Sequence, residues 1–176
     1  ALQTRSVERD PRNVQGHFDL ANDHQSVGVL LYRKGLYAEA LSALDRARDI
    51  AAEARKISPD QRAQLFEIAD THAWRGKALL ALGRTADAVT AMRTALDLGA
   101  HADVSARKPA EQFEFHEWLG DALHARAAEL HAPDMAADAR RSWQTALEGY
   151  QSLAKAGDLP KSYVEQIPVL EQKLRH

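Results

Sequence analysis

Cysteine is absent from the 176 residues of this sequence. Disulfide bridges, thiolate zinc sites, iron–sulfur clusters and a cysteine nucleophile are therefore excluded. The sequence also has no apolar run near the roughly 20 residues that cross a bilayer. No charged segment followed by an apolar one opens it, so no secretion signal is indicated. We expect a cytoplasmic protein without a membrane partner, although the lack of cysteine fits the periplasm as well.

An excess of charge of one sign is also lacking. The 25 acidic residues nearly balance the 23 lysines and arginines, which gives a formal net charge of -2. A protein that neutralises phosphates needs a basic track, so we expect no nucleic-acid partner. The apolar share of 45% and the charged share of 27% are typical of one globular domain with its own core.

Glycine and proline are few, with 9 and 6 residues. Most prolines separate long stretches rich in alanine, leucine, glutamate, arginine and glutamine, which favour helices. Long alternating runs of β-branched and aromatic residues, which strands need, are missing. The sequence therefore predicts an all-α fold.

The most informative pattern is an internal repeat. Two glycines seven residues apart, Gly28 and Gly35, recur 48 positions later as Gly76 and Gly83. A small–large–small pattern follows each pair. A third copy begins at Gly120, contains an insertion of seven residues and lacks the second glycine. The patterned residues are Ala40, Leu44 and Ala47 in the first copy, Ala88, Met92 and Ala95 in the second, and Ala139, Trp143 and Ala146 in the third.

Each copy predicts a helix–turn–helix unit. A glycine inside a helix costs about 1 kcal/mol relative to alanine, and its repetition at one register indicates that another helix approaches closely there. The small–large–small residues form one stripe on the second helix, which supplies the packing partner. Gly35 and Gly83 are expected to end their helices in the left-handed conformation, and Trp143 is expected in the core.

This register resembles the tetratricopeptide repeat (TPR), a family of stacked helical pairs. The residues that carry the resemblance are Gly28, Leu31, Ala40, Leu44 and Ala47, with Gly76, Leu79, Ala88, Met92 and Ala95 in the second copy and Gly120, Leu123, Ala139, Trp143 and Ala146 in the third. The usual first aromatic position is occupied by His24, His72 and His116. The spacing of 48 exceeds the usual ~34 residues and is similar to long-repeat variants such as those of kinesin light chains. The sequence also resembles the TPR arrays that follow the kinase domain of some bacterial serine/threonine kinases.

The resemblance implies a right-handed α-solenoid of about three repeats with a C-terminal capping helix. The first segment is interpreted as the tail of a truncated upstream repeat, which suggests a longer parent protein. A single helix over 161–176, bent or interrupted at Pro168, is expected to cap the array. The expected segments are the tail at 1–12, the repeats at 13–58, 59–108 and 109–158, and the cap at 159–176.

In such an array the first helix of each unit lines a concave groove. In the third repeat, acidic residues lie on one face of the first helix. Two tryptophans lie beside the groove at matching positions of the second and third repeats, and tryptophan is enriched at binding hot spots. A solvated helix face and packing between helices are the competing interpretations. The candidate partner-binding residues are Gln25, Val29, Tyr32, Trp74, Lys77, Glu114, Glu117, Trp118, Asp121 and His124.

The leading hypothesis is a non-catalytic interaction module that binds a peptide or a partner domain in this groove, or that self-associates. The acidic third repeat suggests a basic partner segment. An alternative is the regulatory C-terminal region of a bacterial serine/threonine kinase or of a transcription regulator. A more remote alternative is a helical metal-dependent enzyme. The stretch that begins at His116 has glycine, Gly120, where the zincin motif needs its second histidine. We therefore expect no cofactor, metal or catalytic residue.

Overall fold

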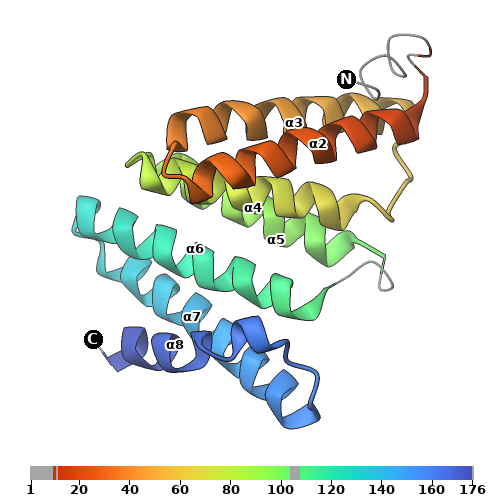
Figure 1. Ribbon diagram of the computed structural model, residues 1–176. Coiled ribbons are helices and arrows are strands. Elements are labelled where there is room, and N and C mark those ends of the chain that lie inside the picture. The colour runs from red at the N-terminus through yellow and green to blue at the C-terminus, as the bar shows by residue number, and fades with distance from the viewer. Residues whose placement is uncertain (1–9, 11, 104–107, 176) are drawn as a thin grey trace.

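The computed structural model describes residues 10, 12–103 and 108–175, and this part is helical without any strand. It contains seven α-helices and one short 3-10 helix (Figure 1). Their bounds are α2 Val14–Arg33, α3 Tyr37–Ile57, α4 Leu65–Ala81, α5 Thr85–His101, α6 Pro109–Leu130, α7 Pro133–Ala156, η2 Lys161–Tyr163 and α8 Gln166–Arg175. The predicted all-α class is confirmed. The expected upstream tail at 1–12 lies outside the described residues, apart from Asp10 and Arg12.

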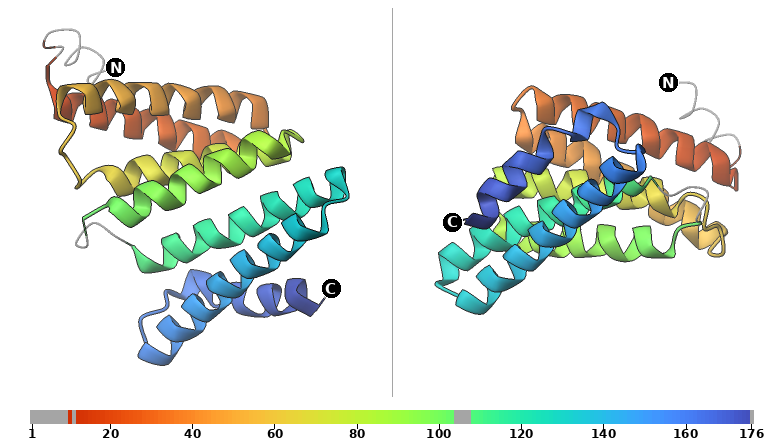
Figure 2. Two further views of the ribbon diagram at one scale, coloured as in Figure 1. Left: turned by 180° about the vertical axis from the view of Figure 1, so that it is seen from behind. Right: turned by 90° about the horizontal axis from the view of Figure 1, so that it is seen from below.

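The helices pack in neighbour-to-neighbour order. Helices α2 and α3, α4 and α5, and α6 and α7 form three hairpins that are stacked along the molecule (Figure 1, Figure 2). The second helix of one hairpin contacts the first helix of the next, as α3 contacts α4 and α5 contacts α6. The first helices α2, α4 and α6 also contact one another in that order. They therefore form one continuous face of the stack, on which the candidate site lies.

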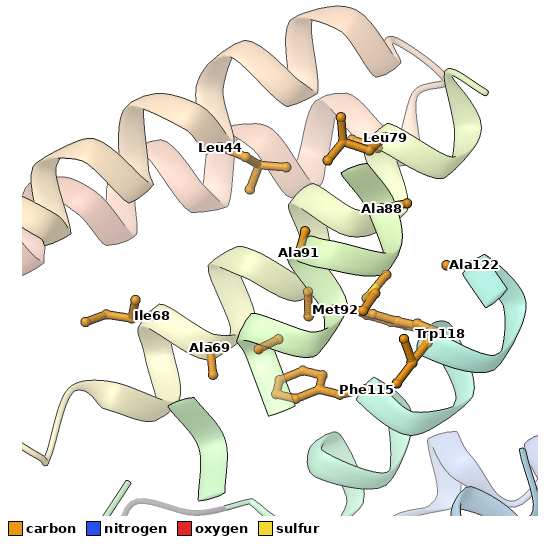
Figure 3. Packing of buried hydrophobic residues seen from close by; sticks show 14 of the residues in the cluster. Leu44, Ile68, Ala69, Leu79, Ala88, Ala91, Met92, Phe115, Trp118 and Ala122 are labelled. Carbon is orange, nitrogen blue, oxygen red and sulfur yellow. The ribbon is translucent and has the colours of Figure 1, made fainter. Parts of the chain in front are cut away.

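The core follows the stack. One apolar cluster extends from Phe18 of α2 to Ala139 of α7, and Figure 3 shows its middle part, where Met92 of α5 lies near Phe115 and Trp118 of α6. A second cluster contains Trp143 and Tyr150 of α7 and Leu170 of α8. The C-terminal helix is therefore attached to the third hairpin by its own apolar contact.

A glycine seam holds each hairpin together, as the repeat predicts. A Cβ atom built on Gly28 would lie 2.6 Å from Leu44 Cγ, and one on Gly76 would lie 2.6 Å from Met92 Cε. A Cβ atom on Gly120 would overlap the ring of Trp143. The predicted close approach is thus present at all three positions, and Trp143 is buried as expected.

The turns of the hairpins differ between the copies. Gly35 and Gly83 have φ angles of 77° and 73°, so the predicted left-handed helix ends are confirmed. In the third hairpin this conformation falls on His131, with φ of 50°. The seven-residue insertion extends α6 by five residues beyond its glycine and α7 by three before its tryptophan, and it shortens the turn by one residue. The insertion therefore lengthens both helices instead of forming a loop.

The C-terminal segment differs from the expected single helix over 161–176. It consists of η2, a short link and α8, so that prediction is wrong. Pro168 lies in the first turn of α8, where its missing N–H would have no partner within the helix, and α8 continues past it to Arg175 without interruption. Among the described residues, no helix is long and apolar enough to span a membrane.

Candidate functional site

Two adjoining pockets form a groove over the face of the first helices. One part of the groove, which we call the concave pocket, has a volume of about 380 Å³ and lies between α4, α6 and η2. The adjoining pocket, also about 380 Å³, lies over α2 and α4. Both pockets are lined by Arg33, Asp70 and Trp74. The other residues that line the concave pocket are Lys77, Lys108, Glu111, Glu114, Trp118, Ser162, Tyr163 and Gln166.

A row of aromatic rings crosses the groove. The ring centroids of Tyr32 and Trp74 are 5.6 Å apart, and those of Trp74 and Trp118 are 5.1 Å apart in an edge-to-face arrangement. The ammonium of Lys77 lies over all three rings, at 4.2 Å from the centroid of Trp118, 5.3 Å from Trp74 and 5.4 Å from Tyr32. These are distances at which a cation is attracted to the face of a ring. Burial lowers the pKa of Lys77, and the nearby carboxylates of Glu114 and Glu117 oppose that shift.

Two carboxyl groups of the concave pocket are half-buried and form no ion pair with a lysine or arginine of the described residues. Asp70 accepts a hydrogen bond of 2.5 Å from Gln25 Nε2, and Gln25 Oε1 accepts one of 2.9 Å from the hydroxyl of Thr71. Burial raises the pKa of Asp70 to about 7, with a further contribution from Glu111. Burial also raises the pKa of Glu114 to about 7. Within the described residues, no lysine or arginine forms an ion pair with Asp70 or with Glu114.

The neighbouring cations of the pocket are engaged elsewhere. Lys108 pairs with Glu67 at 3.7 Å and with Glu111 at 3.4 Å. The guanidinium of Arg33 lies 5.9 Å from the Trp74 ring. The hydroxyl of Tyr163 donates a hydrogen bond of 3.3 Å to Glu114, which connects η2 to the wall of the pocket.

A second acidic position on α6 holds a lysine of the chain itself. Lys173 of α8 donates to Asp121 at 2.7 Å and to Glu117 at 3.2 Å. Its ammonium is 5.7 Å from the Trp143 ring, and the indole N–H of Trp143 donates to Asp121 at 2.9 Å. We call this arrangement the lysine site. Burial raises the pKa of Glu117, and Lys173 counteracts that effect.

The structure divides the candidate residues predicted from the sequence into two groups. Tyr32, Trp74, Lys77, Glu114 and Trp118 lie together at the groove, and Gln25 and Val29 line the adjoining pocket. The remaining three residues lie beyond it: Glu117 and Asp121 are bound by Lys173, and His124 is exposed beside Trp143.

Several pocket residues were missed by sequence reasoning. Asp70 occupies in α4 the position that Glu114 occupies in α6, 44 residues later, so the repeat does place it on the groove-lining face, although it was not among the candidate binding residues. Lys108 and Glu111 precede the repeated register. Ser162, Tyr163 and Gln166 come from outside the repeats, and no sequence signal connects them to the groove.

The comparisons with known proteins assign no family. No protein-family model matches the chain, and no curated protein is significantly similar to it in sequence. Among the described residues, no group of three histidine, aspartate or glutamate side chains is placed to hold a metal ion. The groove, with its aromatic floor and its two unpaired carboxyl groups, is the feature from which a function can be argued.

Proposed function

We propose that this chain is an interaction module of the tetratricopeptide type, a right-handed α-solenoid that binds a segment of a partner protein in the groove over α2, α4 and α6. The observation that carries the proposal is the continuity of the groove. The concave pocket and the adjoining pocket share Arg33, Asp70 and Trp74, so one bound segment could cross all three first helices.

The packing supports this proposal. Stacked helix pairs create an extended binding surface from their first helices, and here the first helices contact one another directly. The glycine seam allows each pair to approach closely at the same register. The groove combines aromatic rings with many charged and polar groups, and the partly exposed Trp74 is an anchor of the kind found at hot spots.

The experiment is a selection of peptides that bind the whole chain, followed by affinity measurements. A library of random peptides is selected on the wild-type protein, and the recovered peptides are titrated by fluorescence anisotropy. We expect that Trp74→Ala weakens binding by at least about tenfold, as the loss of a hot spot of ~2 kcal/mol requires. Arg93→Ala, an exposed change on α5, should leave it unchanged.

Circular dichroism must first show that Trp74→Ala keeps its helical content. Peptides that bind wild type and Trp74→Ala equally would place the binding surface elsewhere. If no peptide is recovered, the peptide-binding proposal fails. Sedimentation velocity of the same two proteins then tests self-association through the groove, which predicts a dimer that only wild type forms.

A further inference from the structure

The lysine site shows how this protein binds a basic side chain. The ammonium of Lys173 contacts the carboxylates of Asp121 and Glu117 and lies over the indole of Trp143. Charge-assisted hydrogen bonds supply the attraction, and the indole face adds a cation–π contact. The aliphatic stem of the lysine is sheltered between α6 and α8, because its side chain is only 26% exposed.

The concave pocket has similar chemistry, but its acids Asp70 and Glu114 form no ion pair within the described residues, although Lys77 acts on Glu114 and Lys108 acts on Asp70 at longer range. Asp70 and Glu114 provide two carboxyl groups, and Trp74 and Trp118 provide two indole rings. The same indoles already attract cations of the chain, since Lys77 lies over both of them and Arg33 lies over Trp74. Lys77 and Arg33 therefore lie over the rings, and neither forms an ion pair with Asp70 or Glu114 within the described residues.

We propose that the concave pocket receives one lysine or arginine side chain of the partner segment, held between Asp70 and Glu114 as Lys173 is held between Asp121 and Glu117. This inference rests on the proposed function and specifies its ligand. The wider acidic cluster favours it, because six carboxyl groups, those of Glu67, Asp70, Glu111, Glu114, Glu117 and Asp121, stand against the four cations Arg33, Lys77, Lys108 and Lys173.

Binding of a cation there should be linked to the release of protons. The pKa values of Asp70 and Glu114 are raised to about 7, so each carboxyl group carries a proton for part of the time at neutral pH. A bound ammonium or guanidinium favours the ionised form and expels that proton. The affinity should therefore increase between about pH 6 and pH 8.

Other titratable groups face these two acids from every element around them. Glu67 and Lys77 come from α4, Glu111 and Glu117 from α6, Lys108 from the residue before α6, Tyr163 from η2 and Tyr150 from α7. Arg33 reaches the pocket from α2. Although burial opposes the shift, the carboxylates of Glu67 and Glu111 raise the pKa of Lys108, so it stays charged throughout this pH range, whereas burial lowers the pKa of Lys77 from its ordinary value. The raised pKa of Tyr163 keeps that hydroxyl protonated.

The probe is Nα-acetyl-lysine N-methylamide, whose side-chain ammonium is free. The control is the corresponding norleucine compound, which lacks that amine. The three indole N–H signals of the 15N-labelled chain are assigned through Trp→Phe variants. We expect the lysine probe to shift the signals of Trp74 and Trp118 in a saturable way and to leave Trp143 unmoved. The norleucine probe should bind at least about tenfold more weakly, the factor expected for the loss of a charge-assisted contact.

The variant Asp70→Asn/Glu114→Gln should remove the pH dependence and weaken the lysine probe to the level of norleucine. Its matched control is Asp60→Asn/Glu39→Gln, which neutralises two exposed acids and should change nothing. Equal binding of the two probes to wild type overturns the inference without relying on any variant. Selected groove peptides that lack basic residues would overturn it too while leaving the proposed function intact. If neither probes nor peptides bind, both fail.

Discussion

The third hairpin and the first two share the glycine seam but fill it differently. Leu44 and Met92 pack against their glycines as flexible aliphatic side chains, whereas Trp143 packs against Gly120 as a rigid ring. Its indole N–H also donates to Asp121, and its ring lies under the ammonium of Lys173. The residue at this repeat position therefore has a second role in the third hairpin, because Trp143 connects the glycine seam to the lysine site and to α8.

The acids of the groove show the same contrast. In the third hairpin Glu117 and Asp121 share an ion pair with Lys173 of α8, whereas Asp70 of the second hairpin and Glu114 of the third form no ion pair within the described residues. This difference indicates that α8 forms ion pairs with the acids at one end of the face, whereas it contributes only Gln166 to the lining of the concave pocket.

The largest loss of stability is expected for Trp143, because its side chain belongs both to the glycine seam and to the lysine site. Trp143→Ala should lower the free energy of unfolding by about 3–5 kcal/mol, the usual loss for a large buried aromatic side chain. Leu44→Ala should cost less, because only packing is lost there. Urea unfolding followed by circular dichroism measures both. A larger loss for Leu44→Ala would show that the contacts of Trp143 with α8 contribute little.

The glycine seams of the second and third hairpins can be compared by replacing the glycine of each with alanine, which adds one methyl group. Gly120→Ala should destabilise by roughly 1–3 kcal/mol through overpacking, because the Trp143 ring can shift only by breaking its hydrogen bond to Asp121. Gly76→Ala meets the flexible end of Met92, so the helix propensity of alanine, worth up to ~1 kcal/mol, should offset most of the strain. Equal costs in urea unfolding would contradict this distinction.

A smaller loss of stability is expected when Lys173 is removed from the lysine site. Lys173→Met keeps the stem of the side chain and removes its charge, which leaves buried Glu117 without its cation. We expect a cost of about 1–3 kcal/mol, as for a charged hydrogen bond. Hydrogen exchange should accelerate in α8 and stay unchanged in α2 and α3. Unchanged exchange in α8 would mean that its apolar contact through Leu170 is sufficient.

The unpaired acids predict a pH dependence of stability. The pKa of Asp70 is about 7 in the folded chain and about 4 when unfolded. The folded state therefore binds more protons between these values, and its stability declines as pH rises from about 4 to 7. Asp70→Asn should remove the part of this decline that Asp70 causes and leave the part caused by Glu114, whose pKa is also raised to about 7.

The control for that measurement is the difference between wild type and variant at each pH. His72 acts in the opposite direction, because burial lowers its pKa to about 4, and its contribution to stability is lost as the pH falls below about 6.5. The subtraction cancels this contribution. Parallel pH profiles of the two proteins would show that Asp70 is solvated and ionised in the folded state.

The smallest effect is expected at the turns. His131→Gly should stabilise the third hairpin by about 0.5–1 kcal/mol, because glycine adopts a positive φ without a steric cost. Gly83→Ala should destabilise the second hairpin by a similar amount. Thermal unfolding of the two variants measures the opposite shifts. A destabilised His131→Gly would indicate that the imidazole makes a favourable contact.

The sequence allowed prediction of those features that depend on a local, repeated register. The partners Gly28 and Leu44 could be paired from the repeat alone, because a glycine of high cost and a large residue recur together at one spacing. The path of residues 159–176 could not be predicted, since Lys173 meets Glu117 across 56 positions of sequence and no repeated spacing marks that contact. For the same reason the pocket residue Tyr163 was missed, although the aromatic floor of that pocket was found.

The pair formed by Trp74 and Trp118 also gives the molecule an optical property. Two indole rings 5.1 Å apart are close enough for their electronic transitions to couple, which produces a paired band in the circular dichroism spectrum that neither ring produces alone. Trp143 lies in another part of the structure and contributes an ordinary signal. If the concave pocket binds the proposed side chain, the angle between the coupled rings should change, and the paired band would then follow binding without any added label.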